Sequence, residues 1–232
     1  LRSLVGSEMC IRDRYSTLLG SDNVSALTIA SFVGRDLVSR RGSGTPIAAF
    51  VSEMNNLARS LRMTKTRFTA PHGLDAGNAV STSCALDMAL LGMYSMQNPA
   101  FCYIVSQASR RIGVQSQTKG TTMYDISNNN KMMSTPGVDG IKAGSSRAAG
   151  QCLLLSATRN AIARRSPQTG TEVIYPQRMI IAVLGTGERY SLARQMLNTG
   201  WRVWENWQAS GMDMKDPKEF VQLPVKSGTE KR

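Results

Sequence analysis

Apolar positions repeat at helical spacing through the first half of the chain. Over 47–61 they fall three and four residues apart, which predicts a helix with one buried face. Thr45 and Pro46 precede this segment, and proline suits the first turn of a helix, where no N–H donor is needed. Three more helices are predicted, over 24–32 after the capping residues Ser21-Asp22-Asn23, over 83–96, and from Asn98-Pro99 to Val105.

The second half of the chain changes to strand patterning. Strands are predicted over 137–145, 152–157 and 179–184, and the last two are apolar on both faces, which is typical of strands in the middle of a covered sheet. The polar, basic segment 159–177 is interpreted as a long hairpin loop. A final helix begins at about residue 189. Helices followed by a meander and a closing helix predict an α+β fold, an antiparallel sheet flanked by helices.

The organisation indicates one folded domain with two atypical ends. The chain has 232 residues, 41% of them hydrophobic, enough for a single core over 15–208. Residues 209–232 read as a polar, Lys-rich tail. Residues 1–14, LRSLVGSEMCIRDR, show no periodicity and resemble translated sequencing adapter, so we expect a non-native segment with few buried contacts. Five charged residues leave it without the apolar core of a signal peptide.

Charge and composition exclude several functions. The net charge of +12 favours an anionic partner, but the basic residues are dispersed and aromatic residues make up only 6%. Without aromatic residues among the basic ones, we expect no nucleic-acid binding, and an acidic polymer or acidic lipids fit better. No two of the four cysteines are spaced Cys-x-x-Cys and there is one histidine, so neither a metal nor a cofactor is expected.

The segment 136–145, PGVDGIKAGS, carries the clearest chemistry. A turn leads into a strand in which Lys142 is followed by Ala143 and Gly144. A lysine beside residues with almost no side chain can bind a carboxylate, because a substrate main chain can lie against the strand. Ser21 and Asn23 offer a hydroxyl and an amide, and we expect Ser21 and Lys142 to converge within hydrogen-bond reach. The simpler alternatives are an N-cap pair and a surface lysine.

Five blocks occur in the order of one known family. Ser21-Asp22-Asn23 resembles its Ser-x-Asn motif, and 136–144 resembles Pro-Gly-Val-Asp-Gly-Ile-Lys-Thr-Gly except at Ala143. Between these two lie blocks similar to Phe-x-x-Pro-His-Gly-Leu over 68–75, to Ser-x-x-Asp-Met-Ala over 83–90, and to Asn-x-Asn-x-hydrophobic over 128–133. Over about 16–205 the chain therefore resembles the D-alanyl-D-alanine carboxypeptidases, the low-molecular-mass penicillin-binding proteins.

The resemblance implies a serine peptidase that removes the terminal D-alanine of peptidoglycan stem peptides through an acyl-serine and also binds β-lactam antibiotics. Ser21 would relay a proton to the leaving amine, Asn23 would bind the substrate amide, and Lys142 would attract the terminal carboxylate. Ala143 and Gly144 would line the substrate, and the N–H of Ser145 would complete the oxyanion hole. A periplasmic or extracytoplasmic location is implied, with peripheral membrane association through a lost C-terminal region.

Two departures from the family pattern stand out. The acylating Ser-x-x-Lys should lie upstream of Ser21, and none is found there, so we expect an N-terminally truncated chain that lacks activity and the first two strands of the sheet. Ser116-Gln117-Thr118-Lys119 falls between the other motifs in what reads as a polar loop, and is interpreted as coincidence. Ala143 lacks the usual hydroxyl, a loss of about 1–3 kcal/mol unless Ser145 or Ser146 replaces it.

Two alternatives to a carboxypeptidase remain open. A class A β-lactamase-like hydrolase also uses Ser-Asp-Asn, but the loop with its glutamate base is not recognisable in the sequence. A non-catalytic peptidoglycan-binding module would keep the groove without the nucleophile. The single histidine, His72, is expected to fix a loop by a hydrogen bond, because no acid and serine partners suggest a catalytic role.

Overall fold

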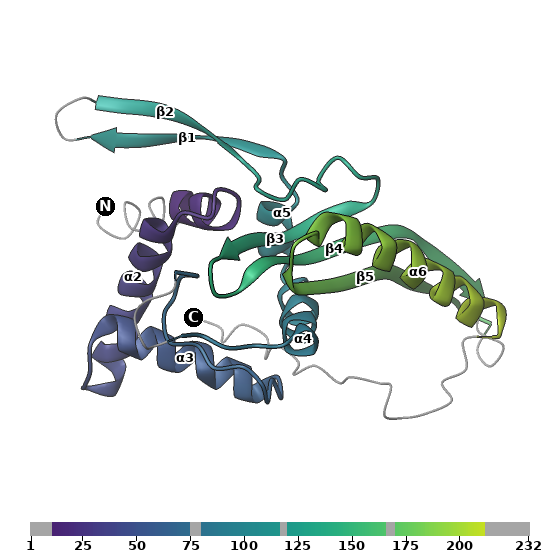
Figure 1. Ribbon diagram of the computed structural model, residues 1–232, viewed down its shortest axis with the longest axis horizontal. Coiled ribbons are helices and arrows are strands. Elements are labelled where there is room, and N and C mark those ends of the chain that lie inside the picture. The colour runs from purple at the N-terminus through teal and green to yellow at the C-terminus, as the bar shows by residue number, and fades with distance from the viewer. Residues whose placement is uncertain (1–10, 75–79, 117–119, 166–169, 212–232) are drawn as a thin grey trace.

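The computed structural model describes residues 11–74, 80–116, 120–165 and 170–211. It is an α+β fold with antiparallel strands and flanking helices, as predicted (Figure 1). The helices are α2 (Asn23–Arg41), α3 (Pro46–Ser60), α4 (Ala85–Ser95), α5 (Pro99–Val105) and α6 (Arg189–Ala209). The strands are β1 (Ser109–Ser116), β2 (Gly120–Ser127), β3 (Val138–Ser146), β4 (Gly150–Arg165) and β5 (Glu172–Thr186).

A three-stranded sheet in the order β3-β4-β5 forms the centre of the molecule. Alternate residues of β4 face opposite layers: Leu153 and Leu155 pack with Trp201 of α6, whereas Leu154 packs with Met96 and Val105 on the side of α4 and α5. Figure 1 shows α6 across one face and α4 and α5 on the other. The predicted coverage of both faces is confirmed. The predicted central position holds for β4, while β5 has one strand neighbour within the described residues.

Strands β4 and β5 are longer than predicted. The segment 159–177 was expected to be a loop, but the ladder continues through it, with Ile162 opposite Tyr175 and Ala163 opposite Ile174. This expectation was wrong because it used polarity as the signal. Polar residues lower burial, yet alternating small and β-branched residues still pair across two strands.

A second antiparallel pair, β1 and β2, extends from the body (Figure 1). The sequence interpretation of 113–120 as a polar loop is wrong, since Ser116 is the last residue of β1 and pairs with Gly120. Residues 117–119 lie outside the described part of the chain. At the base of the hairpin, Ile112 and Ile126 join one apolar cluster with Tyr15 and Leu19.

The first described residues are helical, over 11–18. This helix is held by Tyr15 in the cluster under the hairpin, and Arg12 Nη1 donates to the Gly113 carbonyl oxygen at 2.6 Å. Residues 11–14 therefore belong to the fold, although the sequence analysis left them out, because the helix continues upstream from the buried Tyr15. Residues 1–10 lie outside the described residues, and the non-native origin of 1–14 stays a prediction.

Helix α2 also runs past its predicted end at 32. It reaches Arg41, where Gly42 caps it in the left-handed conformation (φ 79°) and donates its N–H to the Val38 carbonyl. Gly34, in the middle of α2, lies against α3: a Cβ there would sit 1.9 Å from the Pro46 carbonyl oxygen. The close crossing of α2 and α3 thus requires glycine at this position.

Candidate active site

Ser21 lies in the short connection between the helix over 11–18 and α2. Its φ of 59° is uncommon for a residue other than glycine, and such strained residues gather at functional sites. The N-cap of α2 is Asp22, whose carboxylate accepts the N–H of Ser25 at 2.8 Å and that of Val24 at 3.4 Å. The simpler interpretation of Ser21 and Asn23 as the capping pair is therefore wrong, and the Ser21 hydroxyl is left for other contacts.

Asp22→Ala should lower the free energy of unfolding by about 1 kcal/mol, the usual effect of losing an N-cap acceptor. Hydrogen bonds from Ser25 hold the pKa of Asp22 below 3.8. The cap therefore contributes fully above pH 3.8 and is lost as the pH falls through the lowered pKa. Asp22→Asn keeps an acceptor and is the matched control. Urea unfolding of the three proteins at pH 7 and pH 3 measures both effects, and equal stability of wild type and Asp22→Ala at pH 7 would contradict the cap.

Lys142 contacts Ser21, although 121 positions separate the two residues in the sequence. Its Nζ donates to Ser21 Oγ, and to the Ala143 carbonyl oxygen at 2.6 Å. The predicted convergence is confirmed. Strand β3 brings the lysine there because it is the edge of the sheet, next to the start of α2, and its ladder with β4 places Lys142 opposite Leu154.

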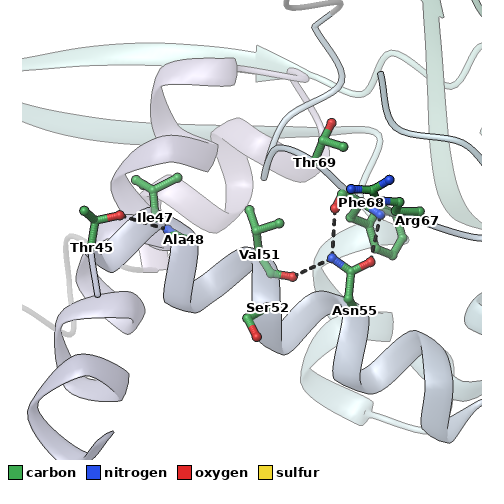
Figure 2. A pocket seen from close by; sticks show the side chains of 9 residues that line it. All are labelled: Thr45, Ile47, Ala48, Val51, Ser52, Asn55, Arg67, Phe68 and Thr69. Carbon is green, nitrogen blue, oxygen red and sulfur yellow. Dashed lines mark hydrogen bonds between the residues drawn. The ribbon is translucent and has the colours of Figure 1, made fainter. Parts of the chain in front are cut away.

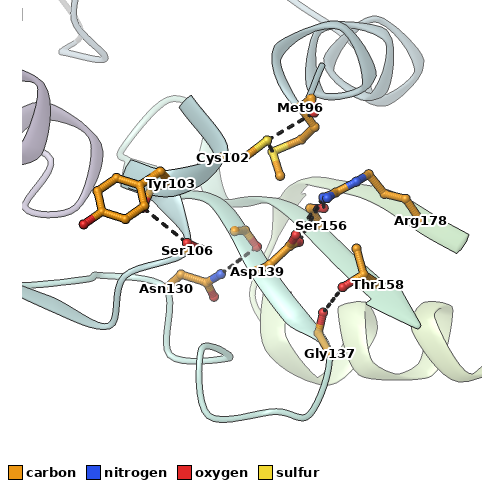
Figure 3. Close-up of polar contacts among 11 residues, drawn as sticks. Met96, Cys102, Tyr103, Ser106, Asn130, Gly137, Asp139, Ser156, Thr158 and Arg178 are labelled. Atoms are coloured by element: carbon orange, nitrogen blue, oxygen red, sulfur yellow. Dashed lines mark hydrogen bonds and ion pairs between the residues drawn. The ribbon is translucent and has the colours of Figure 1, made fainter. Parts of the chain in front are cut away.

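The start of β3 is fixed by a partly buried polar cluster (Figure 3). Arg178 of β5 donates from Nη1 to Asp139 Oδ2 at 2.8 Å and to Ser156 Oγ at 2.5 Å. Ser156 is fully buried, so its hydroxyl depends on this partner. The contacts join β3, β4 and β5 three residues before Lys142.

The environment of Lys142 disfavours its charge. Burial, and then the nearby charge of Arg189, lower the pKa of Lys142 from 10.5 to about 8. Within the described residues neither cation forms a salt bridge with a carboxylate. Two cations close together at the edge strand give this part of the surface a positive potential, which attracts anions such as carboxylates.

Arg189 is the residue that sequence reasoning missed. It begins α6, and its Nη1 donates to the Gly144 carbonyl oxygen at 2.6 Å, while its buried Nε has no partner within the described structure. The sequence contained a signal for Arg189. A cation at a helix N-terminus is unfavourable because it opposes the helix dipole, which indicates that the residue has another role.

Three of the other predicted site residues lie on the same edge strand, Ala143, Gly144 and Ser145, whereas Asn23 is the first residue of α2. Within the described residues Lys142 donates to Ser21 and Ala143 and makes no hydrogen bond to Asn23. The methyl group of Ala143 is buried in the core cluster on the α6 side of the sheet, so only its main chain can face a ligand. Gly144 and Ser145 are exposed. Ser146 Oγ accepts the Ala149 N–H at 3.0 Å in the turn, which leaves Ser145 as the better source of a replacement hydroxyl.

His72 takes the structural role expected for it. Its Nδ1 accepts the N–H of Leu74 at 3.2 Å and thereby fixes the loop. Within the described residues there is no group of three side chains suited to a metal ion, and no helix is both long and apolar enough to span a bilayer.

A separate pocket of about 560 Å³ lies between α3 and the segment 67–69 (Figure 2). Asn55 forms its floor by bonding the Phe68 main chain twice, as donor to the carbonyl at 2.8 Å and as acceptor from the N–H at 2.9 Å. Neither Ser21 nor Lys142 lines this pocket. It is therefore distinct from the serine–lysine site.

The fold itself defines a class of protein. The chain superposes on the Streptomyces K15 DD-transpeptidase with a TM-score of 0.63 and 24% identity, covering 81% of this chain and 66% of that one. It also superposes on Rv2911 from Mycobacterium tuberculosis, a penicillin-binding protein homolog, with a TM-score of 0.57 and 25% identity, covering 76% and 55% of the two chains. These structures place the molecule in the penicillin-binding fold.

The sequence narrows this class to a family. A model of the D-alanyl-D-alanine carboxypeptidase family matches residues 3–166, more than half of the chain, and the chain belongs to that family. Among its relatives are two carboxypeptidases of Escherichia coli strain K12: DacA, 29% identical over 79% of this chain and 40% of its own length, and DacC, 27% identical over 86% and 43%. The chain thus spans about two fifths of the length of these relatives.

Proposed function

We propose that this chain carries the substrate-binding half of a serine-type D-Ala-D-Ala carboxypeptidase site, which acts on peptidoglycan stem peptides and binds β-lactam antibiotics. The contact between Ser21 and Lys142 carries the proposal, because it joins two motifs of the family across the fold. The fold and the family membership support it. An extracytoplasmic location follows from the same substrate, since peptidoglycan lies outside the cytoplasmic membrane.

Ser21 serves as a proton relay in this proposal. The ammonium of Lys142 donates to Ser21 Oγ, which leaves the hydroxyl hydrogen of Ser21 free to point away from the lysine. That hydrogen can pass to the amine of the departing D-alanine while Oγ takes a proton from the Lys142 ammonium, so that the serine hydroxyl is restored and Lys142 becomes neutral. The amide of Asn23, two residues after Ser21 in the same motif, is available to bind the substrate amide.

The substrate lies along β3 in this proposal. An extended peptide can add to the edge of β3 that has no strand neighbour within the described residues, and Gly144 leaves room for its main chain. Its terminal carboxylate then meets the charges of Lys142 and Arg189. In this proposal the N–H of Ser145, an exposed residue of β3, donates to the oxyanion, and Ala143 contributes only main-chain groups.

Binding of diacetyl-Lys-D-Ala-D-Ala to the 232-residue chain tests this proposal by NMR titration. At pH 7 the free carboxylate should bind at least about 10-fold more tightly than the same peptide ending in an amide, since a charge-assisted bond is worth roughly 1.5–3 kcal/mol. Affinity should fall as the pH rises through about 8, where Lys142 loses its proton.

Lys142→Met should remove most of the preference for the carboxylate. Lys65→Met is the matched control, because Lys65 is exposed and lies in a loop that does not contribute to the site. Equal affinity for acid and amide in the wild-type chain would contradict the proposed function.

A further inference from the structure

Three consecutive asparagines join β2 to β3, and each binds a different part of the fold. Asn128 Nδ2 donates to the carbonyl oxygens of Val105 at 3.2 Å and Gln107 at 3.0 Å, at the end of α5. Its Oδ1 accepts the Asn130 N–H at 2.9 Å, which fixes the shape of the turn. We refer to residues 128–130 as the asparagine turn.

The second asparagine holds the chain directly before Ser21. Asn129 donates its main-chain N–H to the Leu19 carbonyl oxygen at 3.0 Å, and its Nδ2 to the Gly20 carbonyl oxygen at 2.9 Å. Since Ser21 adopts a strained φ of 59°, its neighbours must hold it in place. Asp22 does so on one side through the cap of α2, and Asn129 does so on the other.

The third asparagine holds the strand of Lys142. Asn130 is 1% exposed, and its Nδ2 donates to the Gly140 carbonyl oxygen at 3.1 Å, two residues before the lysine (Figure 3). Its Oδ1 accepts the Met132 N–H at 3.0 Å. Both ends of the buried Asn130 amide are hydrogen-bonded. A shift of β3 would leave the amide and the Gly140 carbonyl without these partners, so the strand has little freedom to move.

The final helix is attached to the same turn. Tyr190 OH donates to the Asn129 carbonyl oxygen at 3.0 Å and lies 3.4 Å from the Lys131 N–H, which donates to it. Tyr190 follows Arg189, whose guanidinium bonds the Gly144 carbonyl on β3. Through Asn129 and Tyr190, the turn connects α6 with the segment that carries Ser21.

We propose that the asparagine turn, together with Tyr190, positions Ser21 and Lys142 relative to each other. Ser21 and Lys142 are far apart in the sequence. Asn129 bonds Gly20, the residue before Ser21, and Asn130 bonds Gly140, two residues before Lys142. Hydrogen-bonded relays need their atoms placed to within about 0.5 Å, which isolated loops do not provide. The inference rests on the roles proposed above for Ser21 and Lys142.

The experiment measures how far Lys142 is shielded in the full 232-residue chain. Acetic anhydride labelling across a pH series, read by mass spectrometry at Lys142, gives the midpoint of its deprotonation. In the wild-type chain this midpoint should lie at about 8, because Nζ is buried beside Arg189. If Ser21 and Lys142 separate, water reaches Nζ and the midpoint should rise by at least about one unit toward the ordinary value near 10.4.

Asn129→Ala and Tyr190→Phe are the main variants, because Asn129 is exposed and the tyrosine change keeps the ring, so both should fold. Asn130→Ala tests the buried link. Asn55→Ala is the matched control: it removes an amide of the same size that bonds the Phe68 main chain in the separate pocket, and the Lys142 midpoint should stay near 8. The double variant of Asn129 and Tyr190 should shift the midpoint little more than the larger single change, because both residues act on one segment.

An unchanged Lys142 midpoint in both Asn129→Ala and Tyr190→Phe would overturn the inference. If these variants lower the free energy of unfolding as Asn55→Ala does, the turn has a structural role only. The peptide titration separates this inference from the proposed function. A shifted midpoint in a chain that does not bind the D-Ala-D-Ala peptide would keep the positioning role and remove the function.

Discussion

Incubation of the 232-residue chain with penicillin should give no covalent adduct by mass spectrometry. A serine hydroxyl is a weak nucleophile at neutral pH and needs a base within hydrogen-bond reach. Within the described residues the Ser21 hydroxyl is hydrogen-bonded to Lys142, and that amine donates to Ser21 Oγ and to the Ala143 carbonyl. Between the two family motifs the sequence offers Ser116-x-x-Lys119, but Ser116 ends strand β1 and does not begin a buried helix.

An extended chain is the matched comparison. With a family-type N-terminal region that contains Ser-x-x-Lys placed before residue 15, a stoichiometric adduct and D-alanine release are expected. Changing the serine of that added motif to alanine should abolish both. A stoichiometric adduct on the 232-residue chain itself, at Ser116 or Ser21, would contradict the prediction and show that the chain holds its own nucleophile.

Lys142→Met should make the chain more stable by about 1–3 kcal/mol at pH 7. Burial and Arg189 lower the pKa of Lys142 from 10.5 to about 8. A shift of this size corresponds to at most about 3 kcal/mol, and partial exposure of the side chain reduces it. Methionine fills a similar volume without the charge. The gain is expected because the lysine serves the site at the expense of stability.

The stability difference between wild type and Lys142→Met should depend on pH. Below pH 8 the lysine is protonated in both states, and the folded chain bears the full cost of the buried charge. Between pH 8 and 10.5 the folded state releases the proton first, so wild-type stability rises, and above 10.5 the advantage of Lys142→Met should disappear. Urea unfolding of both proteins from pH 6.5 to 10.5 measures this difference, with the exposed Lys65→Met as the control. A wild type more stable than Lys142→Met at pH 7 would be the contrary result.

The sequence predicted those parts of the fold in which periodicity and burial agree. The apolar stripe of 47–61 became α3, and the segment 136–145 became the edge strand that carries Lys142. The hairpin of β1 and β2 was not predictable in the same way. Its residues are mostly exposed, and its stability comes from cross-strand pairing and from Ile112 and Ile126 at the base.

The candidate site also contains residues that the sequence predicted and residues that it did not. Ser21 and Lys142 were found because short motifs carry their chemistry. Arg189 and Tyr190 were not found. The cation at the start of a helix was a local signal for Arg189, but what both residues bind depends on where α6 begins relative to β3, which is a tertiary relation. The asparagine turn was recognised as a motif, but its bond to Gly20 spans 109 positions of sequence and is visible only in the fold.

The cap of α2 by Asp22 has a consequence for how this site can change. Ser21 and Asn23 flank the residue that stabilises the helix, so three neighbouring positions divide two tasks among them. Any short side chain with an acceptor can occupy the middle position. A library varied at position 22 alone could therefore tune thermal tolerance upward or downward while the two outer positions remain available for chemistry. Changes at position 22 would thus alter the stability of the fold at a residue directly beside Ser21 and Asn23.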